Sequence, residues 1–298
     1  MNSEYIKVLQ KKMSVPAKND LNVCVIQPNI VINEVEKNIQ HIESLINTIP
    51  EDKQVDLIVL PETFSVGFTS HPQGVAEHPE TGRTLTWMKE IAKKRNLAIT
   101  GSTVVIEDGK YYNRMYFVTP ETVYKYDKRH LYTPGDEAIH FQRGYDKCIV
   151  DYLGWKINLA VCYDLRFPIW LRNDNHDPYD ILIIVAAWRS EKRHHWCALT
   201  TARAIENQCY VLTSNNVGVL PDSTPNCPDV IYTGDCRIID YFGYTMTEAK
   251  PGVVEILHAQ LHYKDLQEWR MKFQVLFDED DYEIHVENEN RMQALENK

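Results

Sequence analysis

Three apolar runs of the chain each lead into a side chain capable of acid–base or nucleophilic chemistry. Glu62 follows VDLIVLP, Lys128 follows VYKYD, and Cys162 follows KINLAV. Apolar runs of this kind are typical of strands buried in an α/β sheet, and functional groups gather where such strands end. The sequence therefore predicts that these three side chains converge at one cleft.

Cys162 is a candidate nucleophile. A free thiol has a pKa of about 8.5, so a nucleophilic cysteine needs a base or a positive neighbour. We expect a helix over residues 165–171, whose first N–H groups would lie near the sulfur, with the Tyr163 backbone N–H as an oxyanion donor. Position alone does not separate this interpretation from a buried core cysteine at a strand end.

Glu62 and Lys128 are candidate partners of that thiol. A carboxylate at the edge of an apolar environment suits proton transfer, and the alternatives for Glu62 are a helix N-cap or a solvated loop charge. The Lys128 ammonium could stabilise the oxyanion of an acyl transfer, a role worth roughly 3–4 kcal/mol in barrier height. The alternative for Lys128 is an ordinary surface charge.

Hydrophobic periodicity predicts the elements that must position these residues. Apolar spacing predicts helices over residues 35–49, 85–94, 194–207 and 260–272. Apolar and β-branched runs predict strands over residues 22–27, 55–60, 97–105, 111–119, 122–126, 147–151, 155–162, 179–187, 209–214, 233–240 and 252–256. The last two are expected to be joined by a turn near Phe242-Gly243. This alternation indicates one layered α/β domain with helices outside and two packed sheets inside.

Composition narrows the class of protein. The 298 residues are 44% hydrophobic and 25% charged, as in an ordinary globular enzyme. The net charge of −10, much of it in DEDDYE (residues 278–283), argues against nucleic acid or an anionic membrane as partner. The sequence contains no run of 18 apolar residues, so it predicts no membrane-spanning helix.

Cysteine use and the N-terminal segment indicate a cytoplasmic protein. The seven cysteines are an odd number and form no CxxC pair, which favours reduced thiols over a disulfide framework. Residues 1–20 lack the apolar segment and cleavage site of a secretory signal, so we expect a simple extension there.

Two other kinds of site are disfavoured by spacing. His194, His195 and Cys197 lie close together in the sequence and could in principle bind zinc. Adjacent histidines on a helix point about 100° apart, however, so they cannot easily share one ion. We therefore expect no metal site there. Only three residues separate Cys162 from Arg166, which is too short for a phosphatase loop.

Five motifs, in order along the chain, resemble those of the nitrilase, or carbon–nitrogen hydrolase, superfamily. They are LPETF (60–64), YDKRHLY (126–132), VCYDLRFP (161–168), ARAIENQ (202–208) and GDCRIID (234–240). The resemblance covers residues 21 to about 260. It implies a four-layer αββα sandwich, a catalytic Glu62–Lys128–Cys162 triad, and subunits that pair into a homodimer.

Further site residues follow from the same resemblance. Glu137, in PGDEAIHFQRG, matches a second glutamate that holds the lysine in relatives. The motifs are most similar to the ω-amidase branch, which implies that Arg166 binds a substrate carboxylate and that Trp188 lines the pocket. The alternatives are an internal salt bridge of Arg166 to Asp164 or another buried acid, and a core position for Trp188.

The implied reaction is hydrolysis of a small carboxamide through a cysteine thioester, without metal or organic cofactor. For an ω-amidase the substrates are 2-oxo dicarboxylic acid monoamides such as 2-oxoglutaramate. The alternatives are a nitrile, N-carbamoyl-amino-acid or biogenic-amide hydrolase, and a non-catalytic binding member. The expected division of the chain is an extension over 1–20, a hydrolase domain over 21–275 and an acidic tail over 276–298.

Overall fold

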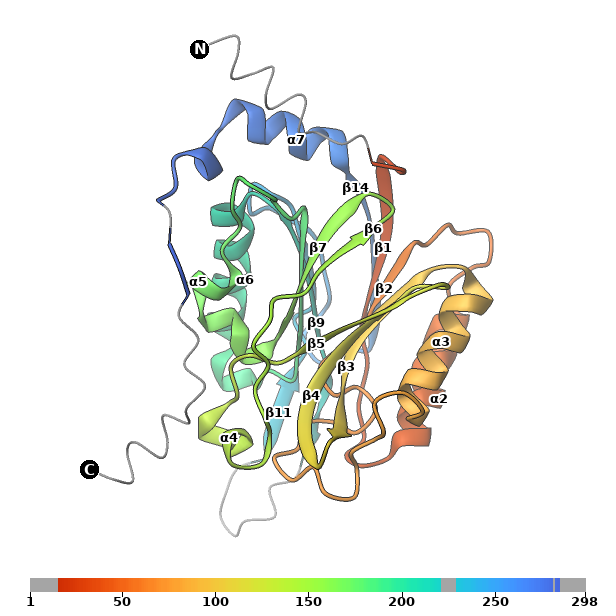
Figure 1. Cartoon of the computed structure of the whole chain (residues 1–298). Coiled ribbons are helices and arrows are strands. Elements are labelled where there is room, and N and C mark those ends of the chain that lie inside the picture. Colours follow the sequence, from red (N-terminus) through yellow and green to blue (C-terminus); the bar gives the residue numbers. More distant parts are fainter. Residues whose placement is uncertain (1–15, 221–228, 281, 285–298) are drawn as a thin grey trace, which may run out of the picture.

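The computed structural model describes residues 16–220, 229–280 and 282–284, which form two six-stranded mixed sheets between helices (Figure 1). The first sheet has the order β14-β1-β2-β3-β4-β5, made of β14 (Glu255–His262), β1 (Asp20–Gln27), β2 (Leu57–Val59), β3 (Ala98–Glu107), β4 (Lys110–Val118) and β5 (Val123–Asp127). The second has the order β13-β12-β9-β8-β7-β6, made of β13 (Thr245–Glu248), β12 (Arg237–Ile239), β9 (Tyr210–Asn215), β8 (Ile181–Ala186), β7 (Trp155–Val161) and β6 (Ile149–Tyr152). A separate hairpin pairs β10 (Val217–Leu220) with β11 (Val230–Thr233).

Helices cover the outer faces of both sheets. Figure 1 shows α2 (Val35–Asn47) and α3 (Arg83–Arg95) beside the first sheet, and α5 (Pro168–Leu171) and α6 (Arg193–Asn207) beside the second. The remaining helical segments are α4 (Glu137–His140), α7 (Tyr263–Lys272) and the short 3₁₀ turns η1 (Thr133–Gly135), η2 (Cys162–Arg166), η3 (Ser190–Lys192) and η4 (Val275–Phe277). The four layers form the αββα sandwich that the resemblance implied.

Strand alternation explains why the inner strands are apolar on both faces. In β1, Val23 and Val25 belong to the core between the sheets, whereas Cys24 and Ile26 belong to the core beneath α2 and α3. Successive side chains of a strand point to opposite faces, so a strand covered on both sides needs both sets. Each fully buried Val, Leu or Ile contributes roughly 1.5–3 kcal/mol.

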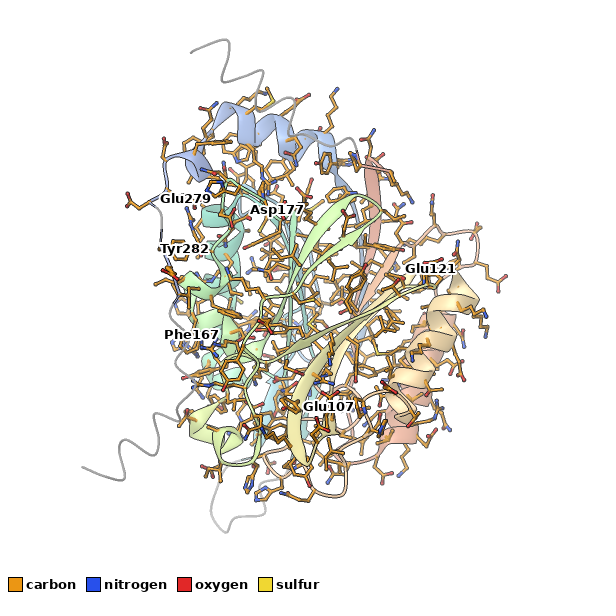
Figure 2. All side chains as sticks on the ribbon, viewed as in Figure 1. Glu107, Glu121, Phe167, Asp177, Glu279 and Tyr282 are labelled. Carbon is orange, nitrogen blue, oxygen red and sulfur yellow. The ribbon has the colours of Figure 1, made fainter. Side chains whose placement is uncertain are left out.

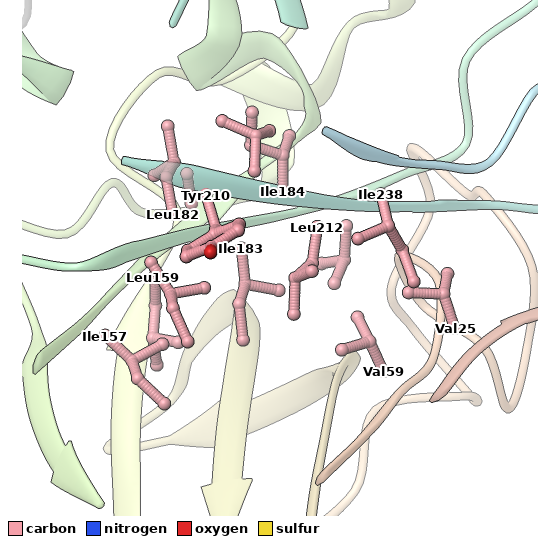
Figure 3. Close-up of a cluster of buried hydrophobic side chains, with 14 of the residues drawn as sticks. Val25, Val59, Ile157, Leu159, Leu182, Ile183, Ile184, Tyr210, Leu212 and Ile238 are labelled. Carbon is pink, nitrogen blue, oxygen red and sulfur yellow. The ribbon is translucent and has the colours of Figure 1, made fainter. Parts of the chain in front are cut away.

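One continuous core joins the two sheets. Figure 3 shows Val25 and Val59 of the first sheet close to Leu212 and Ile238 of the second. A core shared by both sheets means that neither could fold as a unit of its own, which agrees with a single domain.

The predicted C-terminal strands need correction. The turn at Phe242-Gly243 joins β12 to β13, whereas residues 252–256 lead into β14, which runs to His262 and pairs antiparallel with β1 in the other sheet. β13 reads TMTE and is largely exposed, so it has no apolar signal. The helix predicted from residue 260 begins only at Tyr263, because the pairing with β1 keeps the preceding residues extended.

The ends of the chain are described in part. Trp155 Nε1 donates a hydrogen bond to the Lys18 carbonyl at 2.8 Å, which attaches the last residues of the predicted extension to β7. In the predicted tail, the Glu279 carboxylate accepts from Asn175 N at 3.0 Å. Figure 2 shows Glu279 and Tyr282 on the side of the molecule that carries Phe167. Residues 1–15, 281 and 285–298 lie outside the described residues, and the predicted domain limits stay predictions.

Within the part of the chain that the structure describes, none of the helices has the length and apolar character needed to cross a membrane.

Candidate active site

The three candidate side chains lie where strands of the two sheets end. Glu62 comes after β2 and Lys128 directly after β5, both in the first sheet, while Cys162 comes directly after β7 in the second. The site therefore lies between the two sheets. Within the first sheet, the ends of β2 and β5 bring together residues that are 66 positions apart, since Lys128 Nζ is 2.8 Å from Glu62 Oε1.

Lys128 is the centre of a buried charge cluster. Its side chain is 0% exposed, and Nζ contacts Glu62 Oε1 and Glu137 Oε2, each at 2.8 Å. Burial alone would lower the pKa of this ammonium, but the charges of Glu137 and Glu62 outweigh it and hold the pKa well above its usual value. Lys128 is therefore a permanent cation, and the surface-charge alternative is wrong.

Glu62 is held by donors on both of its oxygens. Oε1 also accepts from Asn113 Nδ2 at 2.8 Å, and Oε2 accepts from the Ala187 backbone N–H at 2.8 Å. The side chain is fully buried, which excludes the solvated-loop alternative. A buried carboxylate with three donors keeps a fixed orientation, as a group that transfers protons must.

Glu137 lies on the other side of Lys128, in the first turn of α4. Besides the lysine, its Oε2 accepts from the Tyr132 backbone N–H at 2.7 Å, and Oε1 accepts from Asn113 Nδ2 at 3.1 Å. This placement agrees with the predicted role of holding the lysine. Asn113 thus bridges both carboxylates and was missed in the sequence, although an asparagine inside the apolar strand YYNRMYFV was a usable signal.

Cys162 lies in a strained turn. Its φ is 49°, in the left-handed region that non-glycine residues seldom adopt, and strain of this kind tends to occur at functional sites. The side chain is 8% exposed. Burial first, and then the Glu62 charge, raise the pKa of the thiol well above its usual value, against the opposing charge of Lys128. The free protein therefore holds Cys162 as a thiol beside a carboxylate able to accept its proton.

The predicted helix after Cys162 is wrong in its form. Residues 162–166 form the 3₁₀ turn η2, and α5 has only four residues, Pro168–Leu171. Pro168 ends the first turn because it restricts the residue before it and lacks an N–H. Two turns this short have only a small dipole and cannot supply the positive charge expected of a helix N-terminus. The positive group near the Cys162 sulfur is the Lys128 ammonium.

Asp164 ties the segment that carries Lys128 to the segment that carries Cys162. Its Oδ2 accepts from Tyr126 OH at 2.7 Å and from the Val161 N–H at 3.0 Å, while Oδ1 accepts from the His130 N–H at 2.9 Å. The bonds to residues 126 and 130 flank Lys128 in the chain. A fully satisfied buried network of this kind fixes one arrangement of the strand ends.

A pocket opens at Cys162. It is lined by Phe68, Tyr132, Cys162, Tyr163, Arg166, Ala187, Trp188, Arg189 and Lys192. The Arg166 guanidinium lies 4.6 Å from the centre of the Trp188 ring. Because the Asp164 carboxylate is engaged elsewhere, the alternative of an Arg166–Asp164 salt bridge is wrong. Trp188 both lines the pocket and packs on Trp196, with ring centres 5.4 Å apart, so the two readings of it are compatible.

Among the described residues, no group of three His, Cys, Asp or Glu side chains is placed to hold a metal ion.

An αββα sandwich that joins a buried cysteine, glutamate and lysine at its strand ends matches the class of protein that the motifs implied. The sequence profile of the carbon–nitrogen hydrolase family matches residues 22–271. The chain belongs to the carbon–nitrogen hydrolase family.

Relatives within the family span nearly the same length. The chain is 35% identical over 265 residues to the omega-amidase YafV of Yersinia enterocolitica, covering 88% of this chain and 98% of the relative. It is 31% identical over 263 residues to a 2-oxoglutaramate amidase of Bacillus subtilis, covering 86% of this chain and 96% of the relative.

A solved structure agrees with the fold. A CN-hydrolase superfamily protein of Xanthomonas campestris, crystallised with an arsenic adduct in its active site, has a TM-score of 0.83 and 32% identity. The match covers 90% of this chain and 100% of that one.

Proposed function

We propose that this protein is an ω-amidase that hydrolyses the terminal amide of 2-oxo dicarboxylic acid monoamides such as 2-oxoglutaramate, with Cys162 as nucleophile. The observation that carries the proposal is the buried Glu62–Lys128 ion pair, 2.8 Å long, beside Cys162, which itself lines the pocket. The omega-amidase and 2-oxoglutaramate amidase relatives support the choice of substrate.

In the first half of the reaction, Glu62 accepts the thiol proton of Cys162 and the thiolate attacks the amide carbonyl carbon. Lys128 donates to Glu62 Oε1 and to both oxygens of Glu137, and one of its three N–H groups turns from the longer Glu137 contact, 3.1 Å, to the developing oxyanion. The Tyr163 backbone N–H is the second oxyanion donor. Glu62 then protonates the leaving nitrogen, the C–N bond breaks, and ammonia departs from a thioester.

In the second half, water attacks the thioester carbonyl while Glu62 accepts one of its protons. The C–S bond breaks, the carboxylic acid leaves, and Glu62 returns the proton to the Cys162 sulfur. One carboxylate thus serves as base and then acid in each half of the reaction, and the difficult amide cleavage is divided into two easier steps. The scheme uses only side chains of this protein, with Glu137 and Asn113 holding the lysine and the base.

The substrate's carboxylate is assigned to Arg166, whose half-buried guanidinium lies over Trp188 at the pocket wall. A guanidinium binds a carboxylate through two parallel hydrogen bonds. The positive charge of Arg166 also disfavours glutamine, because glutamine carries an ammonium where 2-oxoglutaramate carries a neutral keto group.

The decisive experiment measures ammonia release from 2-oxoglutaramate beside glutamine, asparagine, a nitrile and an N-carbamoyl amino acid. We expect kcat/KM for 2-oxoglutaramate to exceed the others by about 100-fold or more, since an unpaired polar group in a built site costs at least that ratio. Cys162→Ala is the matched control. A preference for any other compound contradicts the ω-amidase assignment, and ammonia release by the Cys162→Ala protein contradicts the nucleophile.

We further propose that the protein is cytoplasmic and that two copies pair through an aromatic patch. This patch consists of Ile205, Phe242, Tyr244 and Phe273, all exposed, with Tyr244 at 72%. The rings are continuous through Trp269, whose centre is 4.0 Å from Phe242 and 5.3 Å from Phe273. A contiguous apolar surface of this kind marks an interaction site, and a second copy would cover it symmetrically.

We expect light scattering after size exclusion to give the mass of a dimer for the wild-type protein. The double substitution Phe242→Ser, Tyr244→Ser should shift the population towards the monomer without loss of helical signal in circular dichroism. The matched control is Tyr145→Ser, an exposed tyrosine distant in sequence from the patch. A wild-type monomer, or a dimer unaffected by the double substitution, contradicts this surface.

A further inference from the structure

Two half-buried guanidinium groups line the pocket, those of Arg166 and Arg189. In the described ranges of the chain, neither forms a salt bridge, whereas the neighbouring Lys192 lies 2.5 Å from Glu191 and Arg193 lies 2.8 Å from Asp235. A partly desolvated cation without a counter-ion is unfavourable. A negatively charged substrate in the pocket would supply the missing charge for both.

Arg189 is nevertheless held in place. It lies between Trp188, whose backbone N–H donates to Asn215 Oδ1 at 2.8 Å, and η3, which packs against β11. The buried Tyr232 of β11 faces this segment. Burial raises the pKa of Tyr232 to about 12, against the opposing effect of Arg189, so the phenol stays neutral and cannot balance the charge of the arginine.

Aromatic side chains also line the pocket. The rings of Phe68 and Tyr132 are 6.3 Å apart and those of Tyr132 and Tyr163 are 5.3 Å apart, in edge-to-face contact. Cys162 lines the same pocket, so a substrate bound there would have aromatic rings against its carbon chain and two guanidinium groups available for its acid group. Arg166 lies against two aromatic rings of the pocket, 4.6 Å from the centre of Trp188 and 6.0 Å from the centre of Tyr163, and Arg189 follows Trp188 in the chain.

We propose that Arg189 is a second residue that binds the substrate carboxylate, beside Arg166, and that Tyr232 is a positioning residue that orients Arg189. The proposal deepens the proposed function and depends on it for the identity of the substrate. The negative charge expected of the ligand does not depend on that function. It follows from two guanidinium groups whose polar partners are the neutral or cationic His195 ring for Arg166 and the Tyr232 phenol for Arg189, with no salt bridge to a carboxylate among the described residues.

The test compares two alkylating agents of nearly equal size, iodoacetate and iodoacetamide, in their reaction with Cys162. Each forms a bond from the sulfur to its methylene carbon and releases iodide, but only iodoacetate is an anion. Rates at Cys162 are followed by peptide mass spectrometry. The probe reports ligand charge in the full-length protein even if no amide is turned over. A failure of the ω-amidase assignment therefore remains distinguishable from a failure of this proposal.

We expect Arg189→Gln to lower the ratio of iodoacetate to iodoacetamide rates by about tenfold, the range expected for a lost charge-assisted hydrogen bond. Arg193→Gln removes the same charge nearby but outside the pocket lining, and should leave the ratio within about twofold. Arg189→Lys, which keeps the charge without the two-pronged geometry, should give an intermediate ratio. An unchanged ratio in Arg189→Gln, or an equal fall in Arg193→Gln, overturns the proposal.

The positioning role has its own readout. Tyr232→Phe should lower the rate ratio by about threefold in the wild-type background and leave it unchanged in the Arg189→Gln background, because coupled residues are not additive. With 2-oxoglutaramate as substrate, both Arg189→Gln and Tyr232→Phe should raise KM more than they lower kcat. An additive Tyr232→Phe effect, or a fall in kcat without a rise in KM, contradicts the role given to Tyr232.

Discussion

Glu62→Gln is expected to lower kcat/KM for 2-oxoglutaramate by about 10²- to 10⁴-fold, the range for loss of a general acid–base group. The amide keeps the size of the side chain and can still accept from Ala187 N, so the pocket should persist. It cannot accept the proton of Cys162, so the thiolate no longer forms on demand. Steady-state ammonia release measures the loss.

The same substitution should make Cys162 more acidic. After burial, the charge of Glu62 is the next cause that raises the pKa of the thiol, while Lys128 lowers it. Removing the carboxylate and keeping the ammonium therefore favours the thiolate, and the pH profile of Cys162 alkylation by iodoacetamide should move to lower pH. The variant would then have a thiol that is alkylated at lower pH but a much lower kcat/KM. A misfolded site would lose activity without this change in the alkylation profile.

Glu90→Gln is the matched control for this prediction, because Glu90 lies exposed on α3. It should leave both activity and the alkylation profile unchanged. If the kcat/KM of the Glu62→Gln protein stayed within tenfold of the wild-type value, Glu62 would not be the general base. A shift of the alkylation profile to higher pH would contradict the charge assignment at the sulfur.

Lys128→Met is expected to abolish turnover and to lower the free energy of unfolding by about 3–5 kcal/mol, the usual cost of breaking a buried ion pair. Methionine nearly fills the space of the lysine, so little of the loss comes from a cavity. The loss arises because Glu62 and Glu137, both buried, would face each other without the cation that now joins them. Urea unfolding followed by circular dichroism measures the change.

The controls for Lys128→Met separate charge from packing. Lys125→Met, an exposed position on the same strand whose Nζ is 3.7 Å from Glu107, should cost less than about 1 kcal/mol. Adding Glu137→Gln to Lys128→Met should recover about 1 kcal/mol or more by removing one of the two facing charges. A Lys128→Met protein as stable as wild type, or no recovery in the double variant, would contradict the account of the charge cluster.

The acidic tail illustrates a limit of what sequence patterns can predict. The acidic residues after Asp278 predict only an acidic tail, yet the Glu279 carboxylate lies 3.4 Å from Arg172 Nε. A single contact between a carboxylate and an arginine more than a hundred positions away leaves no periodic signal. Asn113 is different, because a polar residue inside an apolar strand is visible in the sequence, and only its two partners, Glu62 and Glu137, required the structure.

The sequence by itself determined the layered α/β class, the strand ends that carry Glu62, Lys128 and Cys162, and membership of the family, because burial alternation and motif order are local properties of the chain. Only the tertiary structure decided that Lys128 lies between two carboxylates, those of Glu62 and Glu137. It also decided that Asp164 binds the neighbours of that lysine instead of Arg166. The reason is physical: buried polar groups must all find partners, and which partner is in reach depends on how separate strands pack.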